Sequence, residues 1–149
     1  MIKKRAAFLA LCFFLAACAA APHSAPVQTF EIAPSAALDD DLKQLDALVL
    51  RHDFLAVPTN RDRTETSFGP VDVLRSYEFR DRRSLKLSIG WELRRSRYRI
   101  FVTDFGRGDE QARALECRKY LEILADVKKT FGANRVAPAT AETCDAGSS

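Results

Sequence analysis

Two neighbouring segments, LKLSIGWEL (Leu85–Leu93) and RYRIFVTDF (Arg97–Phe105), decide the fold. In the first segment, apolar residues alternate with small or charged residues along the whole length, which is the period of a β-strand with one buried face. A turn near Arg95 and Ser96 brings the second segment back beside the first. The two segments therefore predict an antiparallel hairpin at the centre of a sheet.

The register of this hairpin is suggested by both of its faces. Pairing Leu93 with Tyr98 makes one face wholly apolar. On the opposite face, the same register pairs Glu92 with Arg99 and Gly90 with Phe101. Opposite charges and an aromatic ring over a glycine are both favourable cross-strand pairs, so both faces support one register.

A further strand is predicted at Val71–Phe79, joined to the hairpin through Arg80–Ser84. Its alternation turns Arg75 toward the core, which predicts either a β-bulge near Leu74 and Arg75 or an edge position where the arginine reaches water. Thr64–Phe68 has the composition of a fourth, short strand.

Helices are predicted on both sides of the strands, at Leu38–Ala56 and Asp109–Phe131, because apolar residues recur there at the helical period. Pro58 follows the first helix and Gly132 follows the second, as expected of helix ends. The predicted class is α+β, with an antiparallel sheet of three to four strands, two amphipathic helices packed on one face, and the order α-β-β-β-α.

The amino terminus has the features of an export signal. Met1–Arg5 is basic, Ala6–Ala17 is an apolar run too short to span a membrane, and LAAC follows at Leu15–Cys18. These residues resemble the lipobox of bacterial lipoprotein precursors. The resemblance implies that residues 1–17 are a signal peptide and that Cys18 carries lipid, with palmitate among its acyl chains.

The same resemblance implies a location. Ala19, rather than aspartate, follows Cys18, which in such lipoproteins favours the outer membrane, with the protein facing the periplasm. Residues 18–37 are rich in alanine and proline and are predicted to form a flexible tether. Residues 38–149 then form a single domain.

Two cysteines, Cys117 and Cys144, remain once the signal peptide is removed and Cys18 is acylated. The periplasm is oxidising, and the spacing of these cysteines matches no common metal site, so they are predicted to form a disulfide.

The charge distribution does not favour a nucleic-acid partner, but it indicates a binding surface on the domain. The chain has 23 Lys+Arg and 20 Asp+Glu, but three of the basic residues lie in the signal peptide, so the mature chain is neutral. Residues 61–107 are nevertheless basic and residues 31–60 acidic. The predicted binding surface lies on the sheet face away from the helices, and its residues are Phe101, Arg94, Arg97 and Arg99.

Catalytic motifs are not evident in the sequence. We find no serine elbow, phosphate loop, zinc spacing or calcium loop, so no catalytic residue, cofactor or metal is predicted. The expected function is binding or scaffolding, with an envelope protein or an anionic glycan as partner, besides the membrane that holds the anchor. Two alternatives stay open: an immunity-type inhibitor of a toxin, and a small hydrolase that uses His52 with nearby acids.

Overall fold

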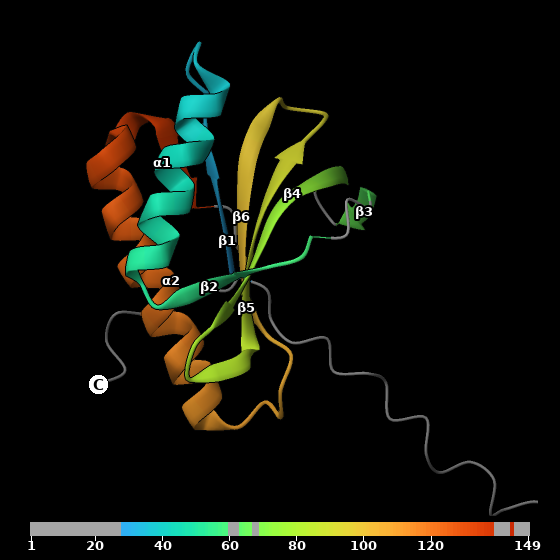
Figure 1. The fold of residues 1–149 in the computed structure, drawn as a ribbon, viewed down its shortest axis with the longest axis vertical. Helices are drawn as coiled ribbons and strands as arrows, with labels where there is room; N and C mark the ends of the chain where they lie inside the picture. The colour runs from blue at the N-terminus through green and yellow to red at the C-terminus, as the bar shows by residue number, and fades with distance from the viewer. Residues whose placement is uncertain (1–27, 60–62, 67–68, 139–143, 145–149) are drawn as a thin grey trace, which may run out of the picture.

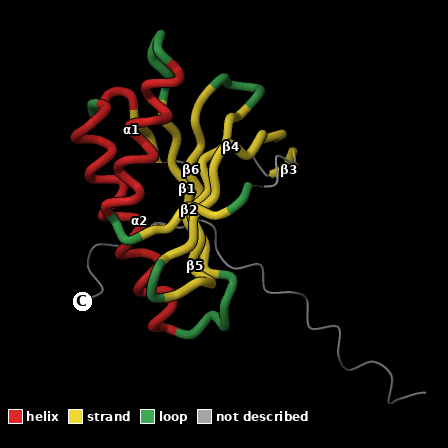
Figure 2. Tube along the Cα trace, viewed as in Figure 1, coloured by secondary structure: helices red, strands yellow, loops and turns green. Residues whose placement is uncertain are grey.

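The computed structural model describes residues 28–59, 63–66, 69–138 and 144 (Figure 1). Its elements are β1 (Gln28–Ile32), α1 (Leu38–Arg51), β2 (Phe54–Val57), β3 (Arg63–Thr66), β4 (Gly69–Phe79), β5 (Arg82–Glu92), β6 (Arg97–Asp104), α2 (Glu110–Phe131), the short 3-10 helix η1 (Ala133–Arg135) and β7 (Val136–Pro138). Both α-helices lie on the same face of one sheet, as Figure 2 shows in red and yellow.

The sheet is antiparallel and larger than predicted. Six strands form a row in the order β2-β4-β5-β6-β1-β7, and β3 pairs with the part of β4 that β2 leaves free. The α+β class and the antiparallel sheet are therefore confirmed, whereas the count of three to four strands was too low. β1, β2 and β7 are the strands that the sequence analysis missed.

β1 corrects the predicted domain boundary. Residues 28–32 were assigned to the tether, but all five side chains of β1 are buried and the strand pairs with β6 on one side and β7 on the other. Phe30 and Ile32 point into the core. The domain thus begins at least ten residues before the predicted start at Leu38.

β2 corrects the predicted end of the first helix. α1 ends at Arg51, and Asp53 then adopts a left-handed backbone conformation with φ 65°. This turn places the Phe54 ring in the core, with its centroid 5.4 Å from that of Phe79. Phe54–Val57 is consequently an edge strand rather than the last turn of the helix.

The hairpin of β5 and β6 forms as predicted, but its register differs by two residues. Trp91, not Leu93, lies opposite Tyr98, and Phe101 lies opposite Ser88. A shift of two leaves every side chain on its predicted face, since strand side chains alternate with a period of two. The Trp91 and Tyr98 rings make an edge-to-face contact at 5.1 Å. The predicted bulge is also present, because the pairing of β4 with β5 shifts between Val73 and Arg75.

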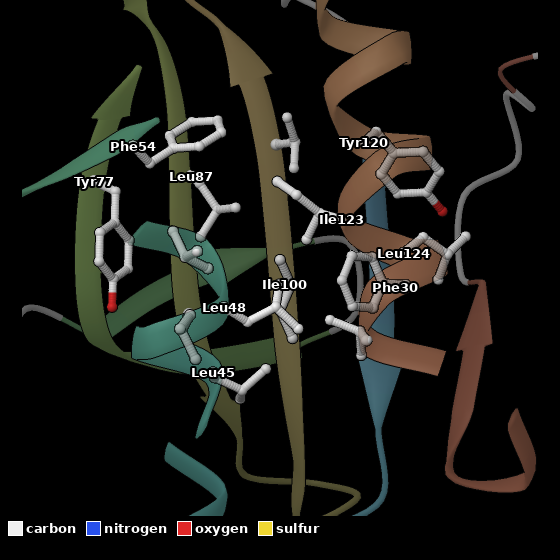
Figure 3. Close-up of a cluster of buried hydrophobic side chains, with 14 of the residues drawn as sticks. Phe30, Leu45, Leu48, Phe54, Tyr77, Leu87, Ile100, Tyr120, Ile123 and Leu124 are labelled. Atoms are coloured by element: carbon white, nitrogen blue, oxygen red, sulfur yellow. The ribbon is translucent and has the colours of Figure 1, made fainter. Parts of the chain in front are cut away.

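The core lies between the helices and the sheet (Figure 3). α2 begins after Asp109, whose side chain accepts a hydrogen bond from the Ala112 N–H at 2.7 Å, and it ends before Gly132 as predicted. Ile123 on this helix is fully buried, whereas Cys117 is half-buried.

The two ends of the sheet carry different loops. At the near end lie the β4–β5 hairpin (residues 80–84) and the β6–α2 loop (residues 105–109), both toward the bottom of Figure 1. At the far end lie the β5–β6 turn (residues 93–96) and the start of α1. β1 is antiparallel to β6 and starts with Gln28 opposite Val102, so the chain enters the fold from the near end.

Candidate functional site

The predicted binding surface is only partly exposed. Arg94 is exposed, and Phe101 and Arg97 are half-buried on the face of the sheet opposite the helices. Arg99 is 1% exposed, so its assignment to a contact surface was wrong. The physical reason is that two carboxylates, on β1 and β5, pair with its guanidinium inside the fold.

These carboxylates belong to Glu92 and Glu31, which are 1% and 4% exposed. The Arg99 Nε atom donates a hydrogen bond to the Glu92 carboxylate at 2.9 Å, and its Nη2 atom donates to Glu31 at 3.1 Å. Glu31 also accepts hydrogen bonds from Arg95 and Arg97, both at 2.8 Å. This buried charge cluster ties β1 to β5 and β6.

The predicted contact between Glu92 and Arg99 is present, but the predicted register that places them directly opposite each other is wrong. The two residues are diagonal rather than opposite, since Arg97 takes the position opposite Glu92. A long guanidinium nevertheless reaches the diagonal neighbour. Gly90 and Phe101, the other predicted pair, are also diagonal neighbours. A Cβ atom at Gly90 would lie 3.6 Å from the Phe101 ring.

The far end combines exposed leucines with exposed arginines. Leu38 and Leu93 are 45% and 37% exposed. Arg94 and Arg95 follow Leu93 directly in the β5–β6 turn and are exposed as well. We call Leu38, Leu93, Arg94 and Arg95 the far-end surface.

An open groove lies on the outer edge of β4. Its volume is about 610 Å³, and it is lined by Arg63, Asp72, Val73, Leu74 and Arg75. β2 pairs with residues 76–79 of β4 and β3 with residues 69–72, so the groove occupies the interval at the bulge where neither strand pairs. Polar groups here are already engaged: Arg63 donates to Asp72 at 2.9 Å.

His52, the alternative catalytic residue, is held between the two helices. Its Nε2 atom lies 2.9 Å from a carboxylate oxygen of Asp126, and its Nδ1 atom lies 3.9 Å from one of Glu122. Its side chain is 14% exposed. Among the described residues, the hydrogen bond and ion pairs of the ring go to these two carboxylates, which join the end of α1 to the middle of α2.

A second acidic pair was not predicted from the sequence. Glu116, on α2, is 3% exposed and accepts a hydrogen bond from the backbone N–H of Asp104 at 2.8 Å. Burial, together with the charge of Asp104, raises the pKa of Glu116 to about 7. The pKa of Asp104 is lowered instead: burial opposes this shift, but hydrogen bonds from Gly106, Ser84 and Arg82 outweigh it.

Two carboxyl groups with opposite pKa shifts are a common feature of acid–base sites. Here, however, every contact that shifts them is internal to the fold. Glu116 accepts a hydrogen bond from the backbone N–H of Asp104, the last residue of β6. The Asp104 side chain accepts a hydrogen bond from the Gly106 N–H at 2.7 Å in the following loop. No sequence signal marked the pair, because Glu116 reads as an ordinary polar position of an amphipathic helix.

The cysteines fall into two groups. Cys117 and Cys144 form the predicted disulfide, with Cα atoms 5.3 Å apart. Cys18 and the predicted signal peptide lie outside the described residues.

The described residues contain no group of three or more His, Cys, Asp or Glu side chains placed to hold a metal ion. Within that part of the chain, no helix has the length and apolarity needed to cross a membrane. Comparisons of the chain with protein-family models, curated proteins and solved structures find no match.

Proposed function

We propose that this chain is an outer-membrane lipoprotein whose α+β domain faces the periplasm and binds or scaffolds another component of the cell envelope. The amino-terminal LAAC supports the anchor. One structural observation supports the binding role: the far end carries two exposed leucines and two exposed arginines, whereas the chain that leads to Cys18 joins β1 at the near end.

The far-end surface has the composition of a protein contact. Apolar side chains supply the area that association buries, and arginines supply orientation and a faster association rate. Arg95 already donates to Glu31, whereas the Arg94 side chain lies across Gly69, about 3.0 Å from where a Cβ would stand. Arg94 lies at the exposed surface beside Gly69, and an acidic protein or an anionic glycan is the partner that its charge favours.

The alternatives differ in how well the geometry supports them. An immunity-type inhibitor would use the same surface on a different partner. A hydrolase that uses His52 is supported less well, because Asp126 and Glu122 hold the ring between two helices in the way that a structural histidine is held.

The anchor is tested by Cys18→Ala. We expect the wild-type chain to incorporate palmitate and to fractionate with the outer membrane. The variant lacks the cysteine that would carry the acyl chains, and because stable attachment depends on these chains, we expect it to be released. A variant that stays in the outer-membrane fraction, with a wild type that incorporates no palmitate, would refute the lipoprotein assignment.

The contact surface is tested by site-specific photo-crosslinking in intact cells. A photoreactive residue in place of Leu93 should give one discrete adduct with an envelope component, and the same residue in place of Arg118, exposed on α2, serves as the control. Adding Arg94→Glu should remove the adduct without changing the melting temperature. Equal adducts from both positions, or an adduct that survives Arg94→Glu, would place the contact elsewhere.

A further inference from the structure

The near end of the domain carries the most exposed of the large apolar side chains that the structure describes. Phe105 is 69% exposed, in the loop between β6 and α2. A single exposed apolar residue needs no explanation on most surfaces. This one is notable for its position, because it lies at the end of the sheet where the chain from Cys18 joins the fold.

The loop holds Phe105 in place. The Phe105 N–H donates a hydrogen bond to the Ser84 carbonyl at 2.8 Å, and the next N–H, that of Gly106, donates to Asp104 at 2.7 Å. A Cβ atom at Gly106 would lie 2.8 Å from the Ser84 hydroxyl oxygen, so the loop is packed closely against the β4–β5 hairpin. The fold therefore presents the ring to solvent on a fixed support, which lowers the entropic cost of using it in a contact.

Arginines flank the ring. Arg83 precedes Ser84 in the hairpin, and Arg107 follows in the loop; both are exposed. Asp81 and Asp109 lie on the same two segments and are exposed too. The apolar ring, rather than net charge, must therefore provide the main attraction of this end, with the arginines adding contacts to anionic groups.

The length of chain between the anchor and the domain restricts what this end can reach. Gln28 lies opposite Val102, three residues before Phe105, so the ring is roughly 10 Å beyond the point where the chain enters the sheet. Ten peptide steps separate Cys18 from Gln28 and span at most about 35 Å. An anchored domain is thus confined close to the bilayer, where a weak contact becomes effectively intramolecular and needs little intrinsic affinity.

We infer that the near end docks on the bilayer that holds the lipid anchor, with the Phe105 ring among the acyl chains and Arg83 and Arg107 beside the phosphates of anionic lipids. The inference rests on the proposed function, because it requires a lipidated Cys18. Docking by the near end directs the far-end surface away from the membrane, toward a partner in the periplasm.

Tryptophan fluorescence tests the orientation. The lipidated protein is reconstituted in vesicles of phosphatidylethanolamine and phosphatidylglycerol with brominated acyl chains, which quench only nearby indole rings. Two variants, Phe105→Trp at the near end and Leu93→Trp at the far end, are compared with the wild type, which contains Trp91 alone. We expect additional quenching in Phe105→Trp and none in Leu93→Trp.

The role of the arginines is tested in the Phe105→Trp background. Arg83→Glu should lower the ratio of docked to undocked domain at least about fivefold, since each basic side chain near an anionic surface contributes roughly that factor. Arg94→Glu, at the far end, is the matched control and should leave the ratio unchanged. Equal effects of the two substitutions would overturn the contact of Arg83 with phosphate.

The inference and the proposed function fail in different ways. Mass spectrometry of the reconstituted protein first establishes whether Cys18 carries acyl chains. Acylated protein in which Phe105→Trp is quenched no more than Leu93→Trp would overturn docking by the near end and leave the lipoprotein assignment intact. Protein isolated from cells without acyl chains would overturn both.

Discussion

Replacing Arg99 by methionine is expected to destabilise the sheet strongly. Arg99 and Glu92 are each 1% exposed, and all the hydrogen bonds and ion pairs of the Glu92 carboxylate in the described residues go to Arg99. Arg99→Met therefore leaves a buried carboxylate without a cation, which costs about 3–5 kcal/mol. Domains of this size have a free energy of unfolding of about 5–15 kcal/mol, so the loss is a large share of the total.

The assay is urea unfolding of the mature chain with its disulfide intact, followed by the fluorescence of Trp91. A loss of 3–5 kcal/mol corresponds to a urea midpoint lower by about 1 M or more. Arg95→Met is the matched control, because Arg95 also pairs with Glu31 but its side chain is 53% exposed. We expect it to cost less than about 1 kcal/mol.

A double variant separates the buried charge from simple loss of packing. Arg99→Met with Glu92→Leu removes both charges, and apolar residues of similar volume commonly replace a buried ion pair at little cost. The double variant should therefore be more stable than Arg99→Met alone. If Arg99→Met costs no more than Arg95→Met, or if the two changes are additive, the reasoning about a buried charge cluster is wrong.

Three further predictions concern other parts of the domain. Cys144→Ser should lower the free energy of unfolding by about 3–4 kcal/mol, and two alkylatable thiols in freshly isolated wild-type protein would contradict the disulfide. The pKa of Glu116, about 7 in the fold against 4.5 ordinarily, means that the folded state binds the proton more tightly, so stability should fall as pH rises from about 4.5 to 7, by up to about 3 kcal/mol. Glu116→Gln should flatten this slope in urea unfolding at pH 5 and pH 8, and an unchanged slope would assign it to other groups. His52→Gln should lower stability by about 1 kcal/mol and leave partner capture unchanged, whereas a folded variant that loses a measured hydrolytic activity would establish the enzyme alternative.

The sequence predicted the strands whose two faces differ. β5 is the clearest example: Leu85, Leu87 and Ile89 are fully buried, and the residues between them are polar or small. Alternation fixes which face is buried, but it is blind to a slip of two residues, since such a slip keeps the faces unchanged. The turn that closes on Ser96, with φ 51°, sets the register, and nothing in the alternation encodes that conformation.

β1 could not be predicted for the opposite reason. Its side chains are buried on both faces, and one of them is the charged Glu31, which alternation reads as a solvent position. Glu31 is tolerated inside the fold only because Arg95, Arg97 and Arg99 converge on it from β6 and the preceding turn. The same contacts removed Arg99 from the predicted binding surface, so one tertiary cluster accounts for both errors.

The position of β1 has a mechanical consequence for a domain anchored through Cys18, as proposed. Any pull between membrane and partner enters the fold at Gln28, the first residue of β1. β1 pairs with β6 along all five of its residues and with β7 along three, and the Tyr120 hydroxyl donates to the Thr29 carbonyl at 3.1 Å. Removing β1 would also separate Glu31 from its three arginines inside the fold, at the energetic cost of breaking buried ion pairs. A load on the anchor would therefore act on an interior strand that is paired on both edges, and the charge cluster that buries Arg99 also holds this strand to β5 and β6.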